Sequence, residues 1–385
     1  MLAPMGTRGS KGSLRAVASS ATLFHTQRST FPQTLIAFVT SRCNASCDFC
    51  LYKESVANPV RRQEELTVAE YEAVAGAYGP LHYLGLSGGE PFVRTDIAEV
   101  CQAFIDRCGT KVIDIPSNFF YGDRMVEVAT TLLERNPHVM LDLQLSIDHV
   151  GSHHDQSRGV AGLYEQALAT FARLEAVREQ HPNLRLKVNI VWLPRNQDDL
   201  REIHAELARR VGFDRIQLTY PHDLIPVDGA PERLDDLERF VQAADRLAAD
   251  EGRQGIDLYS TPMRATKRSY HRLLRQAVDG STPMGERCGA GRILVVLDER
   301  GEVFPCETKW ESVGNVRQHD LDIGKVLAGP RYAQFAADNL GPRQCNCTWS
   351  CAALSAVSVT PRLLAGLAVD TAREVARSAV GRTAP

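Results

Sequence analysis

The stretch that decides the fold is Cys43-Asn44-Ala45-Ser46-Cys47-Asp48-Phe49-Cys50, where three cysteines lie within eight residues. The apolar run 35–39 directly before it predicts a buried strand. A loop leaving a strand can wrap three thiols around one side of an iron–sulfur cube, which normally takes four thiolates. Three protein ligands would leave one iron open, and an open metal position is where a substrate or cosubstrate binds.

A second motif, Ser87-Gly88-Gly89-Glu90-Pro91, follows the next predicted strand, 83–86. Two glycines let the backbone approach a ligand closely, and the carboxylate beside them can accept a hydrogen bond from an ammonium group. Taken alone, such a segment is a plain turn. Its place one βα unit after a three-cysteine loop gives it more weight.

Together the two motifs resemble those of the radical S-adenosylmethionine (SAM) superfamily, with C-x3-C-x2-C, an aromatic residue (Phe49) before the last cysteine, and a GGEP segment. The resemblance implies a [4Fe-4S] cluster whose open iron chelates SAM, and whose electron cleaves SAM to a 5′-deoxyadenosyl radical. The implied cluster ligands are Cys43, Cys47 and Cys50. The residues implied at the methionine amino end of SAM are Gly88, Gly89 and Glu90.

Further polar residues follow the later predicted strands and are weaker candidates for SAM contacts. Leu145-Ser146-Ile147-Asp148 is close to the family's S-[IL]-D-G pattern, although His149 replaces the glycine. Segment 154–159 resembles H-D-x2-R-G, whose arginine would pair with the SAM carboxylate. The candidates are Ser117, Asn118, Ser146, Asp148, Arg158 and Asn189. Each could instead be a turn former, a helix cap or a satisfied core group. The histidines at 149, 153 and 154 predict a polar loop rather than a metal site.

From residue 34 onward, short β-like runs alternate with longer helical runs. Thr67 and Glu70 form a capping-box pattern that opens one such helix, 68–78. Six strands alternating with helices predict an α/β fold with a parallel sheet of right-handed βαβ units. The resemblance implies a partial (β/α)6 TIM-like barrel with its site at the strand C-terminal ends. The predicted strands are 34–40, 83–86, 111–115, 140–147, 184–193 and 215–220.

A second group of cysteines lies near the C-terminus. Strands 292–297 and 302–304, joined by a turn at Gly301, predict a hairpin that could bring Cys288 and Cys306 together. This pattern resembles the opening of the SPASM/twitch extension of radical SAM enzymes. It implies a small cysteine-rich domain with one auxiliary [4Fe-4S] cluster, and a four-cysteine zinc site is the alternative. The remaining candidate ligands are Cys345, Cys347 and Cys351, so five cysteines compete for four positions.

These motifs divide the chain into five expected parts. Residues 1–33 have basic and small polar residues but no acid, which fits a disordered tail better than an organellar transit peptide. The parts that follow are a radical SAM core at 34–225, a helical bridge at 226–285, an auxiliary cluster domain at 286–355 and a C-terminal helix at 356–385.

The composition excludes several classes of protein. A net charge of −3 gives no reason to expect a nucleic-acid partner, and no apolar run approaches the roughly 20 residues that span a bilayer. Eight of the ten cysteines fall in the two groups above, which suits metal binding in a reducing cytoplasm better than disulfides. Cys101 and Cys108, in a predicted helix, are expected in the core.

The sequence therefore predicts a radical SAM enzyme that abstracts hydrogen from a small-molecule or peptide substrate, for net oxidation or cross-linking. No separate peptide-recognition domain is apparent, which slightly favours a small molecule or short peptide over the alternative, a ribosomal-peptide maturase. The rival from another class is an iron–sulfur electron carrier without SAM chemistry, which would need neither the glycine–acid loop nor the βα units. A flavodoxin or ferredoxin is the expected electron donor, and no residue is identified as a catalytic acid or base.

Overall fold

The computed structural model describes residues 31–221, 234–252, 260–278, 288–340, 349–351 and 366–373. Within them, one nine-stranded sheet has the order β6-β5-β4-β3-β2-β1-β7-β8-β9. Six parallel strands of this sheet come before the C-terminal cysteines in the sequence. They are β1 (Thr34–Thr40), β2 (Tyr83–Gly88), β3 (Val112–Ser117), β4 (Met140–Ser146), β5 (Leu184–Val191) and β6 (Arg215–Thr219).

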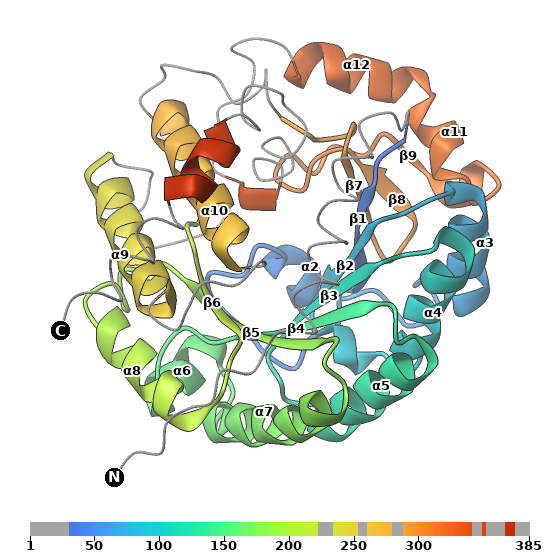
Figure 1. The fold of residues 1–385 in the computed structure, drawn as a ribbon. Coiled ribbons are helices and arrows are strands. Elements are labelled where there is room, and N and C mark those ends of the chain that lie inside the picture. Colours follow the sequence, from blue (N-terminus) through green and yellow to red (C-terminus); the bar gives the residue numbers. More distant parts are fainter. Residues whose placement is uncertain are drawn as a thin grey trace.

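These six strands pair with their sequence neighbours in parallel and form an arc with helices around its outside (Figure 1). The predicted α/β fold with a partial TIM-like barrel is confirmed. The long helices of this part are α3 (Val68–Tyr78), α4 (Ile97–Cys108), α5 (Gly122–Arg135), α7 (Leu163–Gln180) and α8 (Leu200–Arg210). Helix α3 begins with the predicted capping box, in which the Thr67 hydroxyl accepts from the amide of Glu70 and the Glu70 carboxylate accepts from the amide of Thr67.

The C-terminal hairpin extends this same sheet. Strand β7 (Leu294–Leu297) pairs in parallel with β1, and β8 (Glu302–Phe304) and β9 (Gly314–Asn315) follow in antiparallel order. The predicted hairpin is therefore present, with Gly301 at a φ of 89° in its turn. Because β7 lies directly beside β1, the residues after the hairpin reach the part of the core that carries the cysteine loop.

The strands of the arc present an apolar outer side and a partly polar inner side. Along β5, buried and half-buried residues alternate, as expected for a strand with two different faces. The buried carboxylate of Asp142 on β4 pairs with Arg185 and Lys187 on β5, and Lys187 also lies 3.1 Å from Asp114 on β3. These ion pairs satisfy charges that a buried site would otherwise make costly.

Several short elements have little sequence signal. They are α2 (Lys53–Ala57), the 3-10 helices η2 (Pro91–Val93) and η4 (Val316–Gln318), α6 (Gly151–Arg158) and α11 (Ile323–Leu327). Helix α6 replaces part of the predicted polar loop. It lacks apolar periodicity, and tertiary contacts hold it: the Arg158 carbonyl accepts from the amide of Ser46 at 2.9 Å.

Three longer helices complete the described residues. Helices α9 (Leu234–Gly252) and α10 (Ser260–Val278) lie in the predicted bridge, and α12 (Pro330–Asn339) follows the hairpin. Residues 366–373 are helical, within the predicted C-terminal helix. In the part of the chain that the structure covers, no helix combines the length and apolar character needed to cross a membrane.

Candidate active site

The predicted site residues gather at the C-terminal ends of the parallel strands. The cysteine loop follows β1, the GGEP segment follows β2, and Ser117 and Asn118 end β3. The Cys43, Cys47 and Cys50 thiols are half-buried. Backbone amides donate to two of them, Ala45 to Cys43 Sγ and Tyr52 to Cys50 Sγ, both at 3.3 Å. Such N–H···S contacts stabilise thiolates, which are the form that binds metal.

Burial keeps these thiols protonated when nothing compensates a thiolate charge. It raises the pKa of the Cys43 thiol to about 12, and the nearby charges of Glu90, Cys47 and Cys50 push in the same direction. Burial also raises the pKa of Cys47 and of Cys50, although Arg158 lowers both. A cationic centre bound by all three would supply the missing compensation, because metal binding displaces the thiol protons.

Glu90 has the buried carboxylate of the GGEP segment and lies close enough to Cys43 to affect its pKa. Its oxygens accept from the Ser117 hydroxyl at 2.8 Å and from the Asn118 amide at 2.9 Å. Burial raises the pKa of Glu90 to about 6, against the lowering effect of these donors. Glu90 Oε1 also accepts from the Phe92 amide at 3.2 Å. Because each carboxylate oxygen can accept two hydrogen bonds, Oε2 retains capacity for one additional donor such as an ammonium group.

The two glycines of this segment have a packing reason that the sequence did not reveal. A Cβ on Gly88 would overlap the Thr40 carbonyl oxygen, and one on Gly89 would overlap that of Arg42. The amides of Gly89 and Glu90 donate to those two carbonyls at 2.8 and 2.9 Å. The GGEP segment is therefore bonded directly to the backbone that leads into the cysteine loop.

Arg158 lies on the other side of the cysteine loop, at the end of α6. Two of its nitrogens donate to Asp148 Oδ2, at 2.9 and 2.6 Å. Its guanidinium also lies 5.3 Å from the centre of the Phe49 ring, and its charge lowers the pKa of Cys47. Phe49, Asp148 and Arg158 thus form one buried group beside the second and third cysteines.

The other predicted positions lie farther along the strand ends. Ser146 and Asn189 are register partners at the ends of β4 and β5, both half-buried, and Asn189 Oδ1 accepts from the Thr219 hydroxyl at 2.6 Å. Of the three histidines, His149 lies 3.1 Å from Asp199 and His154 is buried. The structure brings Ser117 and Asn118 to Glu90 and gives Asn189 a polar partner of its own.

Two further residues of the cysteine loop were not singled out from the sequence. Asn44 accepts from Asn118 Nδ2 at 2.9 Å, and its own buried Nδ2 has no hydrogen-bond partner in the structure. Tyr52, just after Cys50, donates to Glu299 at 2.6 Å and its ring stacks on Trp310 at 5.4 Å. The unpartnered Nδ2 of Asn44 marks a place where a bound group could accept a hydrogen bond. The sequence signal for Tyr52 is an aromatic residue two positions after the last cysteine.

The C-terminal cysteines are described only in part. Cys288 and Cys306 are both buried, and a Cβ on Gly291 would lie 3.1 Å from Pro305 Cβ, so the loop after Cys288 lies against the end of the hairpin. Burial raises the pKa of the Cys351 thiol, and the nearby charges of Glu307 and Asp114 raise it further. Cys345 and Cys347 lie outside the described residues.

The donor set at the cysteine loop fits an iron–sulfur cluster. It offers three thiols on one loop, amides aimed at two sulfurs, an arginine beside a third, and an unpartnered amide donor. Among the residues described, no three His, Cys, Asp or Glu side chains are grouped as ligands of a single ion.

Comparison with known proteins agrees with this arrangement. Residues 38–208 match the model of the Radical SAM superfamily, so this part of the chain is a radical SAM domain. That family implies a [4Fe-4S] cluster and SAM.

Individual relatives extend over more of the chain. A PqqA peptide cyclase of Rhizobium meliloti (strain 1021) is 27% identical over 314 residues, covering 75% of this chain and 72% of that protein. An AdoMet-dependent heme synthase of Methanosarcina barkeri (strain Fusaro / DSM 804) is 25% identical over 308 residues, covering 74% and 80%. The crystal structure of Streptococcus suis SuiB bound to precursor peptide SuiA has a TM-score of 0.57 at 16% identity, covering 88% and 73%, which is a likeness of fold.

Proposed function

We propose that this chain is a radical SAM enzyme that reductively cleaves SAM and abstracts a hydrogen atom from a peptide substrate, for net oxidation or cross-linking. The observation that carries the proposal is the convergence of the three thiols, Glu90 and the Arg158–Asp148 pair at one edge of the sheet. A ligand set, a buried carboxylate and a buried cation at the strand C-terminal ends are what a bound cluster and an amino-acid-like cosubstrate require.

Each residue has a proposed part. Cys43, Cys47 and Cys50 would hold the cluster, and together with SAM it would supply a 5′-deoxyadenosyl radical. Glu90, oriented by Ser117 and Asn118, would accept from the SAM ammonium group. The buried Phe49 ring, with Arg158 above it, would exclude water from the sulfurs. Gly88 and Gly89 are proposed to act through the backbone, and Ser146, Asp148, Arg158 and Asn189 stay candidates for the remaining SAM contacts, with Arg158 proposed for the SAM carboxylate.

We prefer a peptide substrate over a small molecule because proteins named for peptide substrates are among those that this chain resembles. A PqqA peptide cyclase and SuiB with its precursor peptide are among the proteins that this chain resembles. This differs from the slight preference drawn from the sequence. A small-molecule substrate is the second candidate, since the heme synthase matches a similar share of this chain.

An auxiliary [4Fe-4S] cluster on four of Cys288, Cys306, Cys345, Cys347 and Cys351 completes the proposal, with zinc as the alternative. The domain boundaries given above, the cytoplasmic location and a flavodoxin or ferredoxin donor stay predictions. The auxiliary site is supported by Cys288 and Cys306, which are buried at the same end of the hairpin region.

The decisive experiment is anaerobic reconstitution followed by incubation with dithionite and SAM. We expect 5′-deoxyadenosine from the wild type and none from Cys43→Ala. Its control is Cys101→Ala, which removes a buried thiol on α4. A wild type that binds iron but forms no 5′-deoxyadenosine would support the electron carrier instead.

Substrate class is tested by deuterium transfer. A candidate peptide and a candidate small molecule, each deuterated, are incubated with the reconstituted enzyme. Deuterium in 5′-deoxyadenosine from the peptide alone supports the peptide proposal, and transfer from the small molecule alone reverses it. A gene for a short precursor peptide beside this one would indicate which peptide to use.

A further inference from the structure

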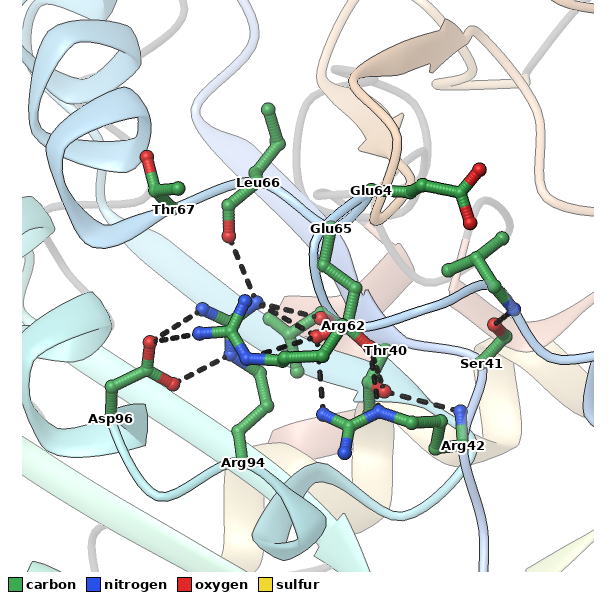
Figure 2. Close-up of polar contacts among 12 residues, drawn as sticks. Thr40, Ser41, Arg42, Arg62, Glu64, Glu65, Leu66, Thr67, Arg94 and Asp96 are labelled. Carbon is green, nitrogen blue, oxygen red and sulfur yellow. Dashed lines mark hydrogen bonds and ion pairs between the residues drawn. The ribbon is translucent and has the colours of Figure 1, made fainter.

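A partly buried group of charges lies next to the residues that lead into the cysteine loop, and the proposed reaction does not use it (Figure 2). We call it the Glu65 network; its members are Thr40, Arg42, Arg62, Glu65, Arg94 and Asp96. The side chains of Glu65 and Arg94 are fully buried. The network joins the end of β1, the segment returning from the cysteine loop and the segment following the GGEP motif.

The Glu65 carboxylate fixes the last residues before Cys43. Thr40 Oγ1 donates to Glu65 Oε1 at 2.5 Å and accepts from the Arg42 amide at 3.1 Å. The Arg42 guanidinium donates to both Glu65 oxygens, at 3.0 and 3.2 Å. A two-pronged pair of this kind restricts orientation as well as distance. One carboxylate therefore holds the side chains of Thr40 and Arg42, and the Thr40 hydroxyl in turn holds the Arg42 backbone amide.

Thr40 and Arg42 also hold the GGEP segment. The Thr40 and Arg42 carbonyls accept from the amides of Gly89 and Glu90. Both glycines pack on this backbone without room for a Cβ. A displacement of residues 40–42 would therefore move Cys43 and Glu90 at once.

Arg94, which follows the GGEP segment, provides a second link to the end of β1. Arg94 Nη1 donates to the Val39 carbonyl at 3.0 Å and to the Leu66 carbonyl at 3.1 Å. Arg94 also donates twice to Asp96 at 2.9 Å, while Arg62 pairs with Asp96 at 2.6 Å and lies 3.5 Å from Glu65. Thr40 and Arg42 thus hold the GGEP segment itself, and Arg94 holds the residues that follow it.

Burying such charges is expensive, and a buried ion pair often stabilises no better than apolar residues of the same volume. What this network does provide is a fixed relation between two loops. From this geometry we infer that Glu65 is a positioning residue. It fixes the cysteine loop and the GGEP segment relative to each other, so that the cluster ligands and Glu90 bind the same cosubstrate. The inference rests on the proposed function.

The test compares Glu65→Gln with Asp142→Asn. Both changes remove a buried carboxylate paired with arginine, but Asp142 lies on β4 and Glu65 beside the cysteine loop. Each protein is reconstituted anaerobically, and iron content, melting temperature and the electron paramagnetic resonance (EPR) spectrum of the reduced cluster are measured with and without SAM. We expect both variants to melt lower than wild type. Only Glu65→Gln should need about 10-fold more SAM to change the spectrum, as is typical when a residue supporting metal ligands is lost.

A second variant covers the case in which Glu65→Gln fails to fold. Arg42→Gln alters a side chain that is 30% exposed and should fold, and we expect the same direction of change, smaller in size. If both folded variants respond to SAM at the wild-type concentration, the positioning role is overturned. If Asp142→Asn shifts the response as far as they do, it is overturned too. A wild-type spectrum indifferent to SAM would instead refute the proposed function, and this inference with it.

Discussion

The two cysteine regions of this chain differ in how their cysteines are brought together. Cys43, Cys47 and Cys50 lie on one short loop, which backbone hydrogen bonds and the Glu65 network hold from below. The C-terminal cysteines come from separate segments, and the segments that follow Cys288 and precede Cys306 meet because a hairpin folds between them. Local spacing therefore groups the first three cysteines, whereas the meeting of the segments that carry Cys288 and Cys306 depends on long-range packing.

The largest expected effect separates the two regions by their part in SAM cleavage. Cys43→Ala should reduce 5′-deoxyadenosine formation by at least about 100-fold, because an iron of the cluster loses its ligand. Cys306→Ala should leave SAM cleavage in the absence of substrate largely intact and remove only the proposed second metal. Iron and zinc counts on the Cys43/Cys47/Cys50→Ala triple variant show what that metal is. Equal loss of SAM cleavage in both single variants would contradict the separation.

A pair of glycine substitutions tests how rigidly each region is held. Gly89→Ala forces a Cβ against the Arg42 backbone, and it should cost about 2 kcal/mol of unfolding free energy and lower SAM affinity. Gly291→Ala meets the movable ring of Tyr332, so its cost should come mainly from the φ of 67° and be about 1 kcal/mol. Urea unfolding measures both, with Gly76→Ala on α3 as the unobstructed control. A costlier change at Gly291 would reverse the comparison.

A buried carboxylate in each region predicts a pH dependence of the metal-free chain. Burial raises the pKa of Glu90 to about 6 and that of Glu307, beside Cys306, to about 8. A carboxyl with a raised folded pKa binds its proton more tightly when folded. Stability is therefore lost as pH rises from the unfolded value, near 4.5, to the folded one.

Replacing the titrating carboxylate by an amide should reduce this loss of stability with rising pH. Between pH 4.5 and pH 7, we expect Glu307→Gln to gain about 3 kcal/mol relative to wild type and Glu90→Gln about 2 kcal/mol. Unfolding free energies from urea titrations at the two pH values give both numbers. Parallel curves for wild type and Glu307→Gln would show that Glu307 is not held neutral.

The smallest effect concerns the surface link between the regions. Arg317, which follows β9, donates to Glu70 on α3 at 2.7 and 3.0 Å and to the Glu64 carbonyl at 3.0 Å. Because the pair is partly exposed, Arg317→Ala should cost only about 1 kcal/mol in thermal or urea unfolding. A loss several times larger would mean that the C-terminal region depends on this contact rather than on the pairing of β7 with β1.

The sequence by itself determined the parts of this protein that depend on neighbours in the chain. The cysteine spacing, the GGEP segment, the alternation of strands and helices and the capping box at Thr67 are all local patterns, and the described structure has the six strands and the hairpin where those patterns predict them. Local geometry is enough because a strand, a cap or a three-cysteine loop needs only nearby residues.

Only the tertiary structure decided which distant residues meet. It made helix α6 from a segment without apolar periodicity, and it placed β7 against β1, so that Tyr52 reaches Glu299. It also gave Gly88 and Gly89 their packing reason and gathered the Glu65 network from three segments. Such contacts depend on three-dimensional packing between residues far apart in sequence, and no spacing rule in the chain encodes them.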